Sequence, residues 1–321
     1  MPHVVTQEND ELIELSILES EEKERIDKVL AARDLGFSRS VLKRWIEEGR
    51  VRVDGDVVAA KRKVLTGQSV EIVPAPPPKT NLEPQDIPLE ILYEDDALLV
   101  LNKPAGLVVH PAPGHPDGTL VNALLYHWQH DRGMQGIRPG IVHRLDKDTS
   151  GVMVVAKSVK VHEALVELFS KHDIGREYLA IVVGNHPLNR RIESLHGRHP
   201  VDRKRFSSKV EQGRRAVTTI ETLERFSGAA LIQCQLETGR THQIRVHCAD
   251  QGFPVLGDIL YAKKPKDPRL VQAYDAVAHQ ALHARHLSFV HPTTKEKLSF
   301  RSEPPVEFEA ALKILQSEKT S

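Results

Sequence analysis

A proline-rich stretch divides this chain into two unequal parts. The segment PAPPPKTNLEPQDIP, residues 74–88, has too many prolines to continue a helix or an inner strand, and such segments form stiff, extended linkers. We therefore predict a linker at residues 75–88, between a small domain over residues 23–74 and a large domain over residues 89–316. The length of 321 residues suits two domains. Residues 1–22 are acidic and are expected to form a mobile leader.

The composition excludes several classes of protein. Apolar clusters such as ALLVL and GVMVVA are far shorter than the roughly 18–20 residues that a membrane helix needs. The acidic N-terminus does not have the basic and then apolar layout of a signal peptide. The two cysteines, Cys234 and Cys248, have neither a metal-binding spacing nor the pattern of a disulfide framework. We expect a cytoplasmic protein with no membrane partner.

The zero net charge conceals two basic segments. Residues 38–63 hold eight Lys and Arg against four acids, and residues 190–215 hold nine against three. Such segments in a neutral protein indicate a polyanionic partner that is bound at defined surfaces. Each segment taken alone could equally be an ordinary solvated surface.

The small domain has a compact pattern that suits RNA binding. Residues 25–32 and 38–49 read as two short helices, and residues 50–60 read as a hairpin with an Asp-Gly turn. A cationic helix face beside a short hairpin can follow a phosphate backbone. The side chains expected to do so are Arg39, Lys43, Arg44, Arg50 and Arg52.

The large domain mixes strands and helices without a regular β-α-β alternation. Strands are predicted over residues 90–104, 151–158, 177–184, 216–226, 230–237 and 287–292. Helices are predicted over residues 120–130, 160–171, 241–252 and 307–317. Consecutive strands pair most simply as antiparallel neighbours, so we predict an α+β fold with a large mixed or antiparallel sheet.

Two polar stretches of the large domain are candidates for chemistry. GIVHRLDKDTSGVMVVAKS (residues 140–158) places Asp146 just before an apolar strand, where the carboxylate is partly desolvated and needs a cation to stay ionised. LETGRTHQIRVH (residues 236–247) places Arg240 at a turn before a helix. From the residues alone, Asp146 could also be a turn cap, and Arg240 and Arg245 could be surface charges.

These stretches resemble the motifs of a known enzyme family. HRLDKDTSG, REYLAIVVG (residues 176–184) and LETGRTHQIRVH are similar to the three motifs of the RluA-type pseudouridine synthases. LNKPAGLVVHP, FPVLGDILY and QALHARHLSFVHP continue the resemblance in order. Residues 24–73 resemble the S4 RNA-binding domain, so the resemblance covers most of the chain, from about residue 25 to residue 308.

The resemblance implies a pseudouridine synthase fold preceded by a small S4-like domain built from helices and a β-hairpin. It also implies that Asp146 is the catalytic carboxylate, that Arg240 is its ion-pair partner, and that Tyr178 stacks on the uracil within reach of a proton transfer. Arg144 would enter the space left by a flipped-out nucleotide. The reaction would isomerise uridine in RNA to pseudouridine without a cofactor or a metal. Whether Asp146 attacks C1′ or removes the C2′ proton stays open.

The basic run between the second and third motifs is expected to lie on a loop or hairpin that closes on the RNA. Its cations are Arg198, Arg203, Lys204 and Arg205. S4-bearing relatives suggest that the substrate is large-subunit (23S) ribosomal RNA or its assembly intermediate, with transfer RNA as the alternative, and we expect a monomer.

Two other classes of function compete with this interpretation. One is a non-catalytic RNA-binding or ribosome assembly factor, which would also use the S4-like domain and the basic segments. The other is a metal-dependent hydrolase that uses His143, Asp146 and His242, although this spacing is not a recognised ligand pattern.

Overall fold

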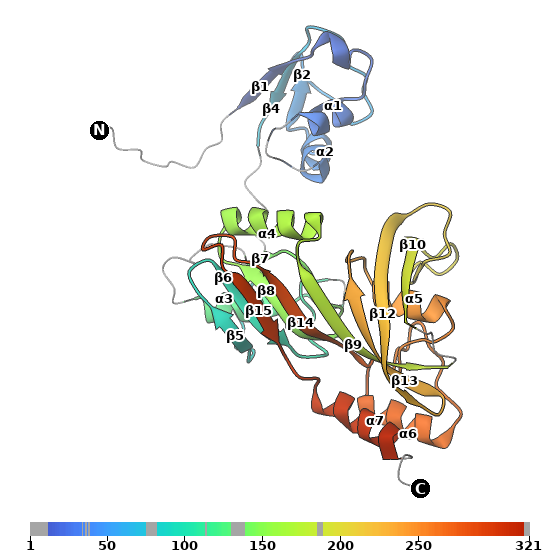
Figure 1. The fold of residues 1–321 in the computed structure, drawn as a ribbon. Helices are drawn as coiled ribbons and strands as arrows, with labels where there is room; N and C mark the ends of the chain where they lie inside the picture. Colours follow the sequence, from blue (N-terminus) through green and yellow to red (C-terminus); the bar gives the residue numbers. More distant parts are fainter. Residues whose placement is uncertain are drawn as a thin grey trace. The chain divides into compact units, whose positions relative to one another are not determined.

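The computed structural model describes residues 12–317, except for 34, 36, 38, 75–81, 113, 130–138 and 185–188 and the side chains of Arg39 and Ser40. The chain forms two compact units, Met1–Asn81 and Leu82–Ser321 (Figure 1). Half of the expected linker, residues 75–81, lies outside the described residues. The last part of the linker is described. There the backbone N–H of Gln85 donates to the carbonyl of Asn122 in α3 (Leu120–His127). The described end of the linker therefore packs on the large unit.

The small unit is a four-stranded sheet with two helices. The strands are β1 (Ile13–Ser16), β2 (Val51–Val53), β3 (Asp56–Val57) and β4 (Ser69–Ile72), in the order β1-β4-β2-β3. The helices are α1 (Ile26–Ala32) and α2 (Arg39–Glu47), with a short 3-10 turn η1 (Glu19–Glu21). The turn between β2 and β3 has positive φ at both Asp54 and Gly55, as the tight hairpin predicted from Asp-Gly requires. The core of the small unit includes the buried side chains of Trp45, Ile26 and Leu42.

Strand β1 lies in the stretch that we expected to be a mobile leader. It pairs with β4 in antiparallel register, Ile13 opposite Ile72 and Leu15 opposite Val70. Ile13 and Leu15 pack against the core of the small unit, whereas the alternate residue Glu14 is exposed. Apolar and polar residues alternate along β1, so only one of its faces is apolar. The prediction missed this strand pattern because the segment is rich in acidic residues.

The large unit is built on an 11-stranded sheet, ordered β11-β10-β12-β13-β9-β14-β8-β6-β5, with β15 paired to β14 and β7 paired to β8. The strands are β5 (Glu90–Glu94), β6 (Leu98–Lys103), β7 (Gly140–Ile141), β8 (Ser150–Ala156), β9 (Gly175–Val183), β10 (Arg190–Arg198), β11 (Phe206–Ser207), β12 (Arg214–Phe226), β13 (Ala229–Leu236), β14 (Leu282–Val290) and β15 (Lys297–Arg301). Among these, β14 and β8 pair in parallel and the other neighbours pair antiparallel. The predicted large mixed sheet is therefore confirmed.

Besides α3, four helices pack on this sheet. They are α4 (Val159–Lys171), α5 (Gln243–Asp250), α6 (Pro268–Val277) and α7 (Val306–Gln316). Helices α6 and α7 pack against each other at one end of the sheet, whereas α4 lies near the other end (Figure 1). Every residue of β8 is buried, which explains its continuous apolar sequence.

Several elements of the large unit differ from the prediction, and the strands β7 and β15 are among those that were not predicted. The expected strand over residues 90–104 is two strands, because Asp95 Oδ1 accepts the backbone N–H groups of Ala97 and Leu98 and closes a turn. Strand β10 was not predicted because it is rich in arginine. Helix α6 was also missed, although Asp267 caps it and Pro268 occupies its first turn, both ordinary signals of a helix start. Among the described residues, no helix is long and apolar enough to cross a membrane.

Candidate active site

Asp146 lies in the loop between β7 and β8, where the buried β8 strand begins. Its backbone carbonyl accepts the N–H of Thr149, which closes a turn directly before Ser150. The Asp146 side chain is 18% exposed and lines a cavity of about 730 Å³. The carboxylate is therefore held by a rigid strand end yet is open to a ligand.

Arg245 of α5 is the ion-pair partner of Asp146. Its Nη1 lies 2.8 Å from Asp146 Oδ2, while its Nε and Nη2 bind the two oxygens of Asp258 at 2.7 and 2.9 Å. Although burial alone lowers it, the hydrogen bonds and charges of the two carboxylates raise the pKa of Arg245 above its usual value. One buried guanidinium thus holds the Asp146 carboxylate in place and is itself anchored by the fully buried Asp258.

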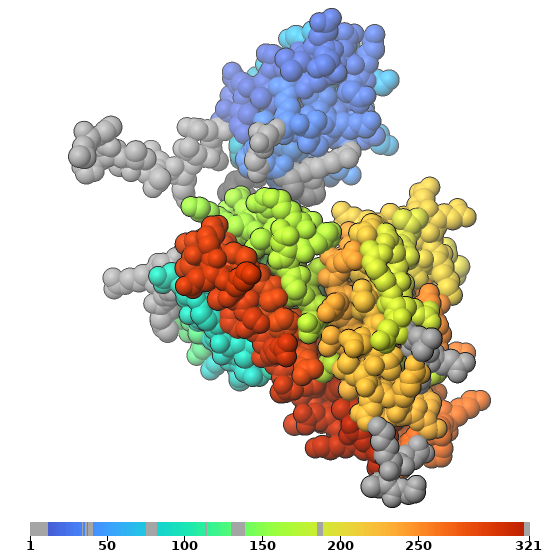
Figure 2. Space-filling model, viewed as in Figure 1, coloured from blue at the N-terminus to red at the C-terminus, as the bar shows by residue number. Residues whose placement is uncertain are grey.

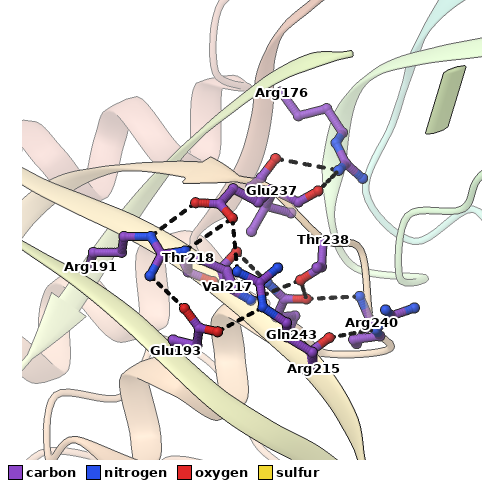
Figure 3. A network of polar contacts seen from close by, with 11 residues as sticks. Arg176, Arg191, Glu193, Arg215, Val217, Thr218, Glu237, Thr238, Arg240 and Gln243 are labelled. Carbon is purple, nitrogen blue, oxygen red and sulfur yellow. Dashed lines mark hydrogen bonds and ion pairs between the residues drawn. The ribbon is translucent and has the colours of Figure 1, made fainter. Parts of the chain in front are cut away.

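The prediction that Arg240 pairs with Asp146 is wrong for this structure. Arg240 Nε donates to the carbonyl of Arg215 at 3.0 Å, and its backbone N–H donates to Gln243 Oε1 (Figure 3). Helix α5 begins only after His242, which has a left-handed backbone with φ 59°. That turn directs Arg240 to the rim and leaves Arg245 on the helix face that meets Asp146. Arg245 stands among apolar residues in the sequence, and a buried arginine in such a place needs a carboxylate.

Tyr178, on β9, lines the same cavity as Asp146 and is 8% exposed. Burial raises the pKa of the Tyr178 phenol, with a further increase from the charge of Asp146 and an opposing effect from Arg176. The hydroxyl therefore stays protonated at neutral pH and can donate a hydrogen bond or a proton.

The cavity wall is strongly cationic. Arg144, Arg176, Arg214 and Arg240 line it, and Asp146 is the one acid among the lining residues that the structure describes. In Figure 2 the surfaces of α4 (green) and β12 (yellow), which both contribute lining residues, border this region. The arginines of the cavity can attract the phosphates of a nucleic acid, and the Tyr178 ring can stack on a base. The cavity therefore suits a nucleotide within a nucleic-acid chain.

Lys103 binds the loop that contains Asp146 through backbone carbonyl groups. The fully buried Nζ of this lysine donates to the carbonyls of Pro104, Leu107 and Lys147 at 2.7, 2.9 and 3.0 Å. Burial lowers the pKa of Lys103 to about 7, although the charges of Asp148 and Asp146 oppose this effect. Three carbonyl acceptors match the three protons of an ammonium group, so the bonds to the loop favour the charged form.

His242 connects the site to the neighbouring hairpin. Its Nδ1 lies 2.9 Å from the hydroxyl of Tyr261, and that hydroxyl accepts the backbone N–H of Phe206 at 2.9 Å. The Nε2 of His242 lies 3.8 Å from Asp146 Oδ2. Since the Tyr261 hydroxyl accepts from Phe206, it can donate to Nδ1, which leaves the Nε2 proton directed at Asp146. The sequence motif did not indicate this connection, because Tyr261 and Phe206 are distant in the chain.

The basic run between the second and third motifs forms the turn between β10 and β11. The Arg198 guanidinium lies 4.4 Å from the ring centre of Phe206 and donates to the carbonyl of Arg203, and the Arg205 guanidinium lies 5.1 Å from the ring centre of Tyr261. The side chains of Arg203 and Lys204 are exposed. A role for this turn in binding RNA stays a prediction.

The predicted cations of the small unit lie beside acids. Lys43, Arg44 and Arg50 are 3.3–3.6 Å from Glu47 or Glu48, and Arg52 donates to the carbonyl of Gly55. The Arg39 side chain lies outside the described residues. Exposed pairs of this kind are weak and can exchange for phosphate oxygens, so these residues stay candidates for RNA contacts.

His143 is a packing residue. Its Nε2 accepts the N–H of Val154 at 3.1 Å, and its ring stacks on Phe169 at 4.7 Å. Burial, with a contribution from the charge of Arg176, lowers the pKa of His143 to about 3. The Nε2 lone pair is already used, which argues against the metal-ligand role considered for His143, Asp146 and His242. Within the described part of the chain, no group of three or more potential ligands is placed to hold a metal.

Comparison with known proteins identifies the family. Residues 97–250 match the RNA pseudouridylate synthase family, and residues 24–70 match the S4 domain. The chain is 43% identical over 300 residues to ribosomal large subunit pseudouridine synthase D of Xanthomonas campestris pv. campestris, covering 92% of this chain and 89% of that protein. The chain belongs to the RNA pseudouridylate synthase family. A protein of the same name from Zymomonas mobilis subsp. mobilis is 45% identical over 298 residues, covering 91% of this chain and 93% of that protein.

A solved structure agrees with this assignment. Human RNA Pseudouridylate Synthase Domain Containing 4 is 27% identical, with a TM-score of 0.58 and coverage of 71% of this chain and 93% of that chain. The expected family and the S4 domain are confirmed. The subtype that the sequence predicts, ribosomal large subunit pseudouridine synthase D, is the name that both bacterial relatives carry. As a pseudouridine synthase, the protein is an isomerase that converts uridine in RNA to pseudouridine, which sets aside the non-catalytic and hydrolase alternatives.

Proposed function

We propose that this pseudouridine synthase modifies uridines of large-subunit ribosomal RNA, with Asp146 as the catalytic carboxylate. The observation that carries the proposal is the ion pair of Asp146 with Arg245 on the wall of a cavity that also contains Tyr178. The bacterial relatives named for the ribosomal large subunit support this substrate, and the S4 domain supports an RNA partner. We also propose that the protein acts as a monomer in the cytoplasm.

The geometry suggests how the reaction proceeds. The N1–C1′ bond of a flipped-out uridine breaks, the uracil turns while it is held, and C5 joins C1′. C5 then loses its proton and N1 gains one, so the product is an isomer of the substrate. Arg245 holds and orients the Asp146 carboxylate for either attack at C1′ or removal of the C2′ proton. Tyr178 stacks on the uracil and keeps its proton at neutral pH, and Arg144 fills the place of the flipped nucleotide in the RNA.

Mapping of pseudouridine in ribosomal RNA tests the proposal. Cells that lack the protein are complemented with wild type, Asp146→Asn or Asp148→Asn, the last being a matched change two residues along the same loop. We expect specific sites to vanish without the protein and to return with wild type and Asp148→Asn only. Recovery of the sites by Asp146→Asn would refute the role of Asp146. If no ribosomal site depends on the protein, the substrate assignment is wrong and transfer RNA becomes the substrate to map.

A further inference from the structure

Arg176 is a buried cation that has no acidic partner in the described part of the chain. It lies on β9 two residues before Tyr178, so the two side chains share one face of the strand, and it is 8% exposed. Its Nη2 donates to the backbone carbonyls of Leu236 and Glu237 at 3.3 and 2.9 Å. No carboxylate lies within ion-pair distance of Arg176 among the described residues. A buried charge without a counter-ion lowers the stability of the fold, and an anionic ligand would offset this loss.

Glu237 contacts Arg176 through its backbone, but its carboxylate points away from Arg176. Figure 3 shows Glu237 offering its backbone carbonyl to Arg176 while its carboxylate points to Arg191 and Arg215. The carboxylate lies 2.9 Å from Arg191 Nε and 3.4 Å from Arg215 Nη2. The positive charge of Arg176 is therefore held in place by carbonyl dipoles and is not neutralised by a side chain.

Arg176 also lines the cavity that contains Asp146 and Tyr178. Its Nε is buried without a hydrogen-bond partner. Its Nη1 lies beside Gly239, so close that a Cβ at that position would be 2.7 Å away. The ring of Phe169, 5.4 Å from the guanidinium carbon, covers another side. Packing thus fixes the guanidinium plane, and no described residue accepts a hydrogen bond from Nη1.

We propose that Arg176 binds a phosphodiester group directly adjacent to the target uridine, an inference that rests on the proposed action on RNA. An N–H group of a buried guanidinium that has no acceptor in the protein suits a phosphate oxygen, because the opposite charges strengthen the hydrogen bond. When the sugar of a flipped uridine reaches Asp146, its flanking phosphates are the anions covalently closest to the cavity. Arg176 would thereby act as a positioning residue that fixes C1′ against the carboxylate.

A double-mutant cycle between protein and RNA tests this contact. The RNA is a hairpin that carries the uridine identified by mapping, prepared with ordinary phosphates or with one uncharged methylphosphonate on the 5′ or the 3′ side of that uridine. Single-turnover rates are measured for wild type, Arg176→Gln, Arg176→Lys and the exposed control Arg225→Gln. Melting temperatures are recorded for all four proteins.

We expect Arg176→Gln to slow the reaction about 100-fold on ordinary RNA, the size typical of a lost positioning contact. At one of the two linkages, the methylphosphonate should slow wild type by a similar factor and should not slow Arg176→Gln further. Arg176→Lys should recover part of the rate and Arg225→Gln should match wild type. Independent, multiplicative losses at both linkages would overturn the inference, as would a rate loss that only follows a lower melting temperature.

Gly239→Ala gives a second test that leaves Arg176 in the chain. The added Cβ would lie 2.7 Å from Arg176 Nη1, so the end of the Arg176 side chain must shift. We expect the same linkage-specific loss, and full activity of Gly239→Ala would overturn the inference. If wild type forms no pseudouridine in this RNA, the proposed substrate is wrong. If wild type is active but the effect of Arg176→Gln is the same with and without a methylphosphonate at either linkage, only the role of Arg176 is wrong.

Discussion

Arg245 shows how much of this site depends on one side chain. Its guanidinium binds Asp146 through one nitrogen and Asp258 through two others. An ammonium group cannot reproduce that fork, because its donors radiate from a single atom. Removing the fork would leave the buried Asp258 without its partner and Asp146 without its orientation.

We therefore predict that Arg245→Lys lowers the single-turnover rate at least 100-fold and lowers the free energy of unfolding by about 3 kcal/mol. The matched variant Arg240→Lys, at the cavity rim, should leave the free energy of unfolding within about 0.5 kcal/mol of wild type. Urea unfolding and single-turnover kinetics on both proteins provide the measurement. A larger loss of stability in Arg240→Lys than in Arg245→Lys would contradict this division of roles.

His247 gives the site helix a dependence on pH. It is fully buried, with Nδ1 2.9 Å from the Thr218 hydroxyl and Nε2 3.0 Å from the Ser194 hydroxyl. Burial, followed by the charge of His196, lowers the pKa of His247 from 6.5 to about 4. Below pH 6.5 the unfolded chain takes up a proton that the folded protein refuses, so stability is present above this pH and is lost as pH falls towards 4.

We expect this one residue to remove up to about 3 kcal/mol from the free energy of unfolding between those two pH values. His247→Asn keeps a polar group but does not titrate there, so its stability should fall less steeply with acid. Urea unfolding at several pH values compares the two proteins. Equal slopes for wild type and His247→Asn would show that other groups control the acid sensitivity.

At the scale of elements, the turn between β10 and β11 is tied to the start of α5. The N–H of Phe206, the hydroxyl of Tyr261 and the ring of His242 form a chain of contacts that ends beside Asp146. Arg198 and Arg205 stack on the same aromatic rings. RNA that binds the arginines of this turn would therefore act on the residues next to the carboxylate.

We predict that Tyr261→Phe slows the single-turnover rate about tenfold and lowers the free energy of unfolding by about 1 kcal/mol, because two hydrogen bonds lose their shared hydroxyl. Tyr274→Phe is the matched control, since the Tyr274 ring packs near Lys264 away from this chain of contacts. An unchanged rate in Tyr261→Phe, measured at saturating protein, would show that the connection has no part in the reaction.

The sequence predicted some elements better than others for a physical reason. The β8 strand was recognised because burial on both faces demands a continuous apolar run. Strand β10 was missed because its exposed face is rich in arginine, and its pairing with β12 decides its conformation. Propensity describes a residue by itself, whereas a strand at a solvent-facing part of a sheet depends on its neighbour.

At the scale of the whole molecule, each unit has its own hydrophobic core. The small unit is centred on residues such as Trp45 and Ile72, and the large unit has two clusters around β9 and β8. Separate cores predict that residues 82–321 fold alone and keep the residues of the active site. The small unit would then supply RNA affinity and not chemistry.

We expect the 82–321 fragment to retain its rate at saturation within about twofold, to bind RNA at least about tenfold more weakly, and to show a smaller dependence of affinity on salt. Fluorescence anisotropy at several salt concentrations, with single-turnover rates, measures all three. Loss of the saturating rate in a fragment that melts cooperatively would show that the small unit takes part in catalysis.

The sequence by itself determined the two domains, the mixed sheet, the enzyme family and the positions of Asp146 and Tyr178. These follow from local signals: proline content, apolar periodicity and motifs whose residues are contiguous in the chain. Only the tertiary structure decided that Arg245 and not Arg240 meets Asp146, that Asp258 anchors Arg245, and that Arg176 is buried without an acid. Those facts depend on which side chains from β9, β13 and α5 converge, and that is set by the left-handed turn at His242 and the pairing of strands distant in sequence.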